Sequence, residues 1–119
     1  MKSFLKKIIH KFSYAFQGLI HGLMHDRSIQ IQAVIGFVVI CIGFYFHFCI
    51  QEWVIVVSMI LLVVASEFAN SVIEEICDTL YPDYDERAKK IKDYAAAFVL
   101  LVSFIAAIVG IYILKGYIV

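Results

Sequence analysis

The sequence predicts an all-α membrane protein in which an N-terminal amphipathic surface helix precedes three transmembrane helices. Three long apolar segments, at residues 31–50, 53–78 and 93–114, support this prediction. Each reaches or exceeds the roughly 20 residues that a helix needs to cross about 30 Å of hydrocarbon. Hydrophobic residues make up 63% of the chain, and the mean hydropathy is +0.91. A soluble domain of 119 residues could not bury such segments, so we expect one integral-membrane domain over residues 1–119.

Residues 1–28 are predicted to form a helix that lies on the membrane surface. Apolar side chains recur at helical spacing along it, and polar side chains occupy the opposite side. The apolar set is Phe4, Leu5, Ile8, Ile9, Phe12, Phe16, Leu19, Ile20 and Leu23, and the polar set is Lys7, His10, Tyr14, Gln17 and His21. This pattern is typical of an interfacial amphipathic helix. The segment lacks the long apolar core and the small-residue cleavage site of a secretory signal.

The first two membrane helices, 31–50 and 53–78, are predicted to form an antiparallel hairpin. Only Gln51-Glu52 separates them, which leaves a very tight turn. Gln32 is the one strongly polar residue near the start of the first span. Tyr81-Pro82-Asp83 then breaks the chain before the third helix.

Basic residues are distributed unevenly around these spans. They are Lys2, Lys6, Lys7, Lys11 and Arg27 before the first span, and Arg87, Lys89, Lys90 and Lys92 between the second and third. The hairpin turn has none, and the C-terminal tail has only Lys115. The positive-inside rule therefore predicts that the N-terminus and the 79–92 loop are cytoplasmic and that the C-terminus lies outside. The formal net charge is zero, which offers no case for nucleic acid as a partner.

Acidic and amide side chains form a stripe at the end of the second span. Glu67, Asn70, Glu74 and Asp78 have offsets of 0, 3, 7 and 11 residues, which fall within an arc of roughly 80° on a helix. An ionisable residue at mid-membrane depth costs about 2.5–3.5 kcal/mol. A stripe that only joined helices would favour Ser, Thr or Asn, because adjacent carboxylates repel one another. The carboxylates therefore predict a hard divalent cation, namely magnesium that arrives with nucleotide phosphates.

Two further positions lie at the predicted level of the stripe. Asp26, where the surface helix turns into the first span, is a second candidate cation ligand beside Glu74. Lys92, which precedes Asp93 at the start of the third span, could hold a phosphate or serve only as a positive-inside anchor. No Walker loop, kinase Gly-rich loop or Rossmann fingerprint is present, so any nucleotide site must be unconventional.

These polar residues combine into one motif: Glu67-x-x-Asn70-Ser71-x-x-Glu74-x-x-x-Asp78, followed by Lys92-Asp93. The motif resembles the signature of the small prokaryotic diacylglycerol kinases, a family that includes the undecaprenol kinases. The resemblance runs from about residue 7 to residue 115. It implies a homotrimer in the bacterial inner (cytoplasmic) membrane, with active sites shared between subunits. It also implies that ATP and Mg²⁺ are used to phosphorylate a membrane lipid alcohol.

The resemblance implies a role for each polar residue. Glu67 would be the general base that takes the proton of the lipid hydroxyl group, and Asp26 and Glu74 would hold magnesium on the ATP phosphates. The family usually has glutamate where this chain has Asp26, which is one methylene shorter. Asn70 would orient Glu67 or the acceptor, and Asp78 would support Lys92. The implied ATP-binding set is Lys7, Tyr14, Asp26, Glu74, Asp83, Tyr84, Asp85, Lys92 and Asp93.

The acceptor lipid is a separate question. Ala15 beside Tyr14, and the run Lys92–Leu100, resemble the Gram-positive branch of the family, so undecaprenol is the predicted acceptor and undecaprenyl phosphate the product. The alternative is a diacylglycerol kinase that makes phosphatidic acid. Remote alternatives are a small membrane transporter, which usually has a lone glutamate in a four-span bundle, and a structural membrane subunit. Neither explains three acids on one stripe together with a Lys-Asp pair.

Overall fold

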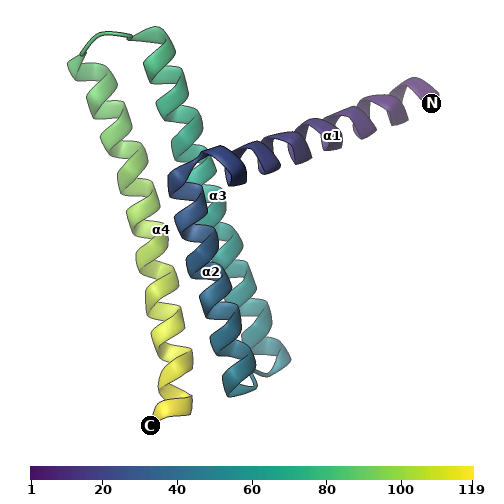
Figure 1. Ribbon diagram of the computed structural model, residues 1–119, viewed down its shortest axis with the longest axis vertical. Helices are drawn as coiled ribbons and strands as arrows, with labels where there is room; N and C mark the ends of the chain where they lie inside the picture. Colours follow the sequence, from purple (N-terminus) through teal and green to yellow (C-terminus); the bar gives the residue numbers. More distant parts are fainter.

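The computed structural model describes residues 1–119 as four α-helices with no strand, which confirms the predicted fold class. The helices are α1 (Lys2–His25), α2 (Arg27–Phe46), α3 (Ile50–Leu80) and α4 (Glu86–Ile118). Helices α2, α3 and α4 lie side by side with alternating chain direction, and α1 leaves them at a steep angle (Figure 1). Each of the three bundled helices is long and apolar enough to cross a membrane.

A single residue, Asp26, separates α1 from α2. Its backbone N–H donates to the carbonyl of Gly22, which is the last helical hydrogen bond of α1. Its carboxylate oxygen Oδ1 accepts from the backbone N–H of Ile29 at 3.1 Å and so begins α2. An aspartate at such an N-cap is worth about 1 kcal/mol. Because the backbone of Asp26 is extended (φ −99°, ψ 116°), the chain changes direction between the two helices.

Two glycines allow the helices to approach closely. A Cβ atom at Gly22 would lie 2.4 Å from Cε1 of Phe68, so the end of α1 contacts α3 through a position that only glycine fits. A Cβ atom at Gly36 of α2 would lie 2.7 Å from Cγ2 of Ile60 of α3. Gly22 therefore fixes where α1 meets the bundle.

The turn between α2 and α3 occupies residues 47–49, and the predicted turn at Gln51-Glu52 is wrong. His47 adopts the left-handed conformation with φ 58°, which ends α2. Glu52 lies in the first turn of α3, where its Oε1 accepts from the backbone N–H of Cys49 at 2.9 Å. A carboxylate at this position caps the helix and complements its dipole. The charge of Glu52 therefore did not indicate a loop, because this carboxylate caps the helix.

Helices α3 and α4 are longer than the predicted spans 53–78 and 93–114. Their 31 and 33 residues correspond to about 46 and 50 Å, well beyond the roughly 30 Å of hydrocarbon. Helix α4 begins early because the Asp85 carboxylate accepts from the backbone N–H groups of Arg87 and Ala88, at 2.7 and 3.3 Å. The α3–α4 end of the bundle rises past the level of α1 (Figure 1).

A small core lies at the end of the bundle that holds the 47–49 turn and the C-terminus. Phe48, Val56 and Ile113 are buried there, and the rings of Phe46, Phe48, Trp53 and Tyr117 pack together as an aromatic cluster. Most other large apolar side chains of the three long helices are exposed. Such outward apolar surface is expected where hydrocarbon is the solvent.

Candidate active site

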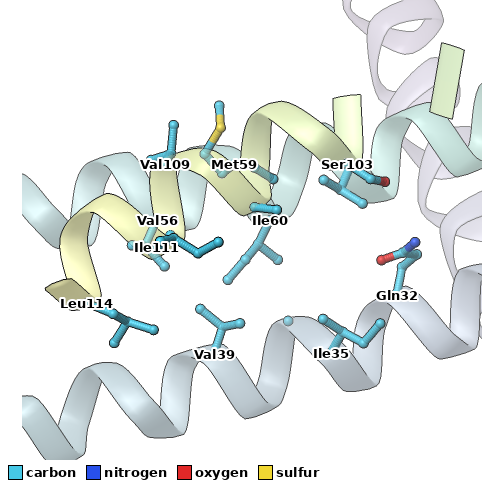
Figure 2. A pocket seen from close by; sticks show the side chains of 15 residues that line it. Gln32, Ile35, Val39, Val56, Met59, Ile60, Ser103, Val109, Ile111 and Leu114 are labelled. Carbon is cyan, nitrogen blue, oxygen red and sulfur yellow. The ribbon is translucent and has the colours of Figure 1, made fainter. Parts of the chain in front are cut away.

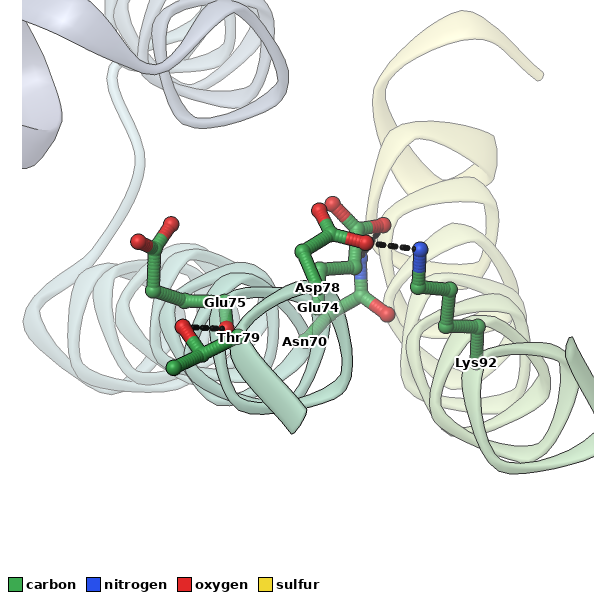
Figure 3. A network of polar contacts seen from close by, with 6 residues as sticks. All are labelled: Asn70, Glu74, Glu75, Asp78, Thr79 and Lys92. Atoms are coloured by element: carbon green, nitrogen blue, oxygen red, sulfur yellow. Dashed lines mark hydrogen bonds and ion pairs between the residues drawn. The ribbon is translucent and has the colours of Figure 1, made fainter. Parts of the chain in front are cut away.

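Four polar residues of α3 and one of α4 form the polar cluster: Glu67, Asn70, Glu74, Asp78 and Lys92. Asn70, Glu74 and Asp78 lie on the side of α3 that faces Lys92, whereas Glu75 points away from it (Figure 3). Burial falls along the helix: Glu67 is 7% and Asn70 8% exposed, while Glu74 and Asp78 are exposed. The cluster therefore runs from a dry interior position to an open one.

Asn70 links two parts of this cluster. Its Nδ2 donates to Oε1 of Glu74 at 3.0 Å, so its contact is with Glu74 and not with Glu67. Its Oδ1 is buried and has no hydrogen-bond partner. An unsatisfied buried acceptor costs about 1–3 kcal/mol. The fold therefore leaves one unpaired acceptor inside the cluster.

Lys92 joins α4 to α3 through an ion pair with Asp78 (Figure 3). The side chain of Lys92 is 37% exposed, so the pair lies at the rim of the cluster. Asp93 instead pairs with Lys89 at 2.7 Å, one helical turn away on the same helix. Both members of that second pair are exposed, and such pairs contribute only about 0.3–0.5 kcal/mol. Lys92 is thus the basic group that contacts the stripe.

Asp26 and Glu74 line the same hollow, which has a volume of about 710 Å³ and is also bordered by Ser71 and Asp78. Asp26 is held there by the hydroxyl group of Ser71, which donates to its Oδ2. No three His, Cys, Asp or Glu side chains lie close enough together to hold a metal by themselves. Two carboxylates fit magnesium, because this ion commonly takes one or two carboxylates and completes its shell with phosphate oxygens and water.

Glu67 receives a hydrogen bond from the neighbouring helix α2. Nε2 of Gln32 donates to Oε1 of Glu67 at 3.3 Å. Gln32 lies at one end of an apolar cavity of about 430 Å³ between α2, α3 and α4 (Figure 2). Ser103 is the other polar residue labelled near that end, and Val39, Ile60 and Leu114 line the rest. The buried acid is therefore joined, through Gln32, to the polar end of an apolar cavity.

Several residues of the implied ATP-binding set lie apart from the polar cluster. Lys7 and Tyr14 are exposed on α1, the helix that leaves the bundle at a steep angle (Figure 1). Asp83 and Tyr84 are exposed in the loop between α3 and α4. The carboxylate of Asp85 caps α4. Within one chain, these residues are not brought to the stripe.

Two contacts of the site were missed by reasoning from the sequence. Ser71, which holds Asp26, is in the motif but received no role, and Gln32 was noted only as a polar residue. The available signal for Gln32 was an amide in an otherwise apolar span. Its partner could not be read from the sequence, because the packing of α2 against α3 decides which residues meet.

Comparison with known proteins supports one family. The family model for prokaryotic diacylglycerol kinase matches residues 13–114. The diacylglycerol kinase of Haemophilus influenzae is 26% identical over 105 residues, which cover 88% of this chain and 89% of that protein. The diacylglycerol kinase of Escherichia coli K12 is 26% identical over 86% of this chain and 84% of its own length. A Synechocystis diacylglycerol kinase is 31% identical over 87% of this chain but 59% of that protein.

Proposed function

The chain belongs to the prokaryotic diacylglycerol kinase family, as its motif predicted, and on that premise we propose that it transfers the γ-phosphoryl group of ATP to diacylglycerol. The family makes it an enzyme that phosphorylates an alcohol, and its three long apolar helices make it a membrane protein. One observation carries the proposal for the site. The polar cluster combines a buried glutamate and exposed carboxylates along α3 with a lysine of α4.

In the proposed reaction, the hydroxyl oxygen of the lipid forms a bond to the γ-phosphorus atom. The bond from that phosphorus to the bridging oxygen breaks, and ADP leaves with the bonding electrons. Glu67 takes the hydroxyl proton, because it is the buried acid beside the apolar cavity. General-base assistance of this kind contributes about 10²–10⁴-fold.

The nucleotide phosphates occupy the hollow that Asp26 and Glu74 line. These two carboxylates hold magnesium, which supplies neutralisation of phosphate charge when it is bound. Lys92 neutralises the transferring phosphoryl group from the α4 side, and Asp78 keeps its ammonium group there. Asn70 offers its unpartnered Oδ1 to a donor on the substrates.

Other nucleotide contacts come from a neighbouring subunit in this proposal. Helix α1 projects from its own bundle and carries Lys7 and Tyr14 outward (Figure 1). In a homotrimer, α1 of one subunit can reach the hollow of the next and deliver both side chains to ATP. Asp83, Tyr84 and Asp93 lie at the α3–α4 end and would contact the same nucleotide. Asp85 caps α4 and so holds this loop in place.

Diacylglycerol is favoured over undecaprenol as the acceptor because the curated relatives are named diacylglycerol kinases. The run Lys92–Leu100 supports undecaprenol as a second candidate. Both lipids carry one hydroxyl group on an apolar body. The cavity suits that shape, because its interior is apolar and its polar end is formed by Gln32, which contacts Glu67.

The test is a phosphoryl-transfer assay on purified protein in lipid micelles. ATP labelled at the γ position is supplied with Mg²⁺ and either diacylglycerol or undecaprenol, and label in the chloroform-soluble product is measured. The proposal expects faster labelling of diacylglycerol and none when the metal is chelated. Faster labelling of undecaprenol would transfer the assignment to that lipid. Absence of labelled lipid with either acceptor would remove the kinase assignment.

We also propose that the protein lies in the bacterial inner membrane with its active site in the cytoplasm. The support is the excess of Lys and Arg around the N-terminus and the 79–92 loop. A reporter fused after residue 119 should report outside, and a cysteine at position 86 should react only with reagent on the cytosolic side. Reaction at position 86 from outside would reverse the topology.

A further inference from the structure

Gln32 is the polar residue of α2 that the proposed reaction leaves without a role. It is half-buried and lies six residues after Asp26, within a helix that is otherwise apolar from Ile31 to Phe46. A polar side chain in a membrane span is unfavourable unless it has a partner, so it marks a packing contact or a functional one.

Its contact is with the buried acid of the site. Nε2 of Gln32 donates to Oε1 of Glu67 at 3.3 Å, between two different helices. No other side-chain hydrogen bond reaches the carboxylate of Glu67, so Oε2 is left free. The contact therefore occupies one oxygen of the carboxylate and leaves the other available to take a proton.

The other end of the same amide faces the apolar cavity. In Figure 2 the side-chain oxygen of Gln32 points toward the cavity and the nitrogen points away from it. A hydroxyl group that enters this end of the cavity thus meets a hydrogen-bond acceptor on the same residue that holds Glu67. One amide then both holds the base and meets the acceptor group.

We propose that Gln32 is a positioning residue that orients the Glu67 carboxylate, and through it the acceptor hydroxyl group, for proton transfer. This inference rests on the proposed function, because it presumes that Glu67 is the base. Gln32 itself exchanges no proton. Its effect is on geometry, and small errors in the placement of reacting groups are costly to rate.

The variant Gln32→Met tests this role, because methionine keeps the length of the side chain and removes the amide. We expect kcat to fall about 10–100-fold, as for the loss of one hydrogen bond to a charged group, while KM for MgATP stays within about twofold. Gln32→Asn keeps the amide but is shorter by one methylene, about 1.5 Å, which takes it out of hydrogen-bond range. It should lose kcat similarly.

The matched control is Gln30→Met on the same helix. Gln30 is exposed, and its Nε2 donates to the backbone carbonyl of Met24 and not to any residue of α3. Its kcat should match that of the wild-type protein. If Gln32→Met fails to yield folded protein, Gln32→Asn carries the test, with thermal unfolding in micelles as the check on folding.

A double-variant cycle separates positioning from a general structural role. When Glu67→Gln has already removed the base, adding Gln32→Met should reduce kcat by no more than about twofold, because the two residues act through one step. Losses that multiply would overturn the proposal, as would a fully active Gln32→Met variant. Wild-type protein that phosphorylates no lipid would instead overturn the proposed function itself.

Discussion

Helix α3 carries one glutamate in its first turn and another near its middle, and the two have different surroundings. Glu52, beside the aromatic cluster, accepts from the backbone N–H of Cys49 and from the hydroxyl group of Tyr117. Glu67, in the polar cluster, is buried and accepts one bond of 3.3 Å from Gln32. Two hydrogen bonds therefore hold one oxygen of Glu52, whereas a single longer bond holds the buried Glu67.

This difference indicates a structural role for the first of these glutamates and a chemical role for the second. At the aromatic cluster the ring centroids of Phe48 and Tyr117 lie 5.4 Å apart, and Oε1 of Glu52 has two hydrogen-bond partners. At the polar cluster, Asn70 Oδ1 is buried without a partner and Glu74 remains open. A stable packed end fixes the helices, and the unsatisfied end keeps groups free to meet substrates.

The largest expected effect comes from the same substitution at both glutamates. Glu67→Gln keeps the shape of the side chain but removes the base, so turnover should fall by about 10²–10⁴-fold. ATP binding, measured with a fluorescent nucleotide, should change little because the metal ligands lie elsewhere.

Glu52→Gln is the matched control for that substitution. It weakens a helix cap and should lower thermal stability by about 1 kcal/mol, while turnover stays near the wild-type value. Equal loss of turnover in both variants would show that the two glutamates do not differ in role. Loss of ATP binding in Glu67→Gln, with Glu74→Gln harmless, would exchange the roles assigned to Glu67 and Glu74.

The second effect concerns charge at the open part of the polar cluster. Glu74→Gln removes a carboxylate that is proposed to hold magnesium, and activity should fall by about 10²–10³-fold. A weakened metal site predicts partial recovery at high Mg²⁺ concentration, which a titration of rate against Mg²⁺ would detect. Glu86→Gln, an exposed acid at the start of α4, should keep its activity and Mg²⁺ dependence. A Glu74→Gln variant with normal rate and Mg²⁺ dependence would remove Glu74 from the site.

The sequence predicted the helices and the acidic stripe because both depend on periodicity within one segment. Apolar runs located α2, α3 and α4, and the 3.6-residue period brought Asn70, Glu74 and Asp78 to one face. Helix ends were less predictable. Glu52 suggested a loop but caps α3, and α4 starts at Glu86 because Asp85 caps it.

The partners of the stripe could not be predicted, because they depend on how helices pack. Gln32 reaches Glu67 across 35 residues of sequence, and Ser71 reaches Asp26 across 45. No local pattern encodes these pairs. The resemblance implies that Lys7 and Tyr14 bind ATP, but α1 leaves the bundle at a steep angle (Figure 1). Within a single chain, the fold therefore does not bring these two residues to the polar cluster.

A smaller effect is expected where α1 meets the bundle. Gly22→Ala brings a Cβ atom to 2.4 Å from the ring of Phe68, and overpacking of this kind costs about 1–3 kcal/mol. The unfolding temperature and the activity should both fall, because α1 and Asp26 shift together. Gly18→Ala meets nothing within 4 Å in this chain and should leave the folded subunit unchanged. Gly22→Ala combined with Phe68→Leu should recover part of the loss, and no recovery would mean that the clash lies elsewhere.

The smallest effect is expected at Glu52. Tyr117→Phe removes the hydroxyl group that donates to Glu52 and keeps the ring in the aromatic cluster. Because Glu52 retains the N–H of Cys49, the expected cost is about 1 kcal/mol, the usual net value of one hydrogen bond. Thermal unfolding should show this small decrease, while kcat and KM stay at their wild-type values.

Tyr112→Phe, which removes an equivalent hydroxyl group from a side chain that is 79% exposed, should change neither stability nor turnover. If Tyr117→Phe lowered kcat tenfold without loss of stability, the aromatic cluster would be coupled to the reaction, and the division of α3 into a structural end and a chemical end would be wrong.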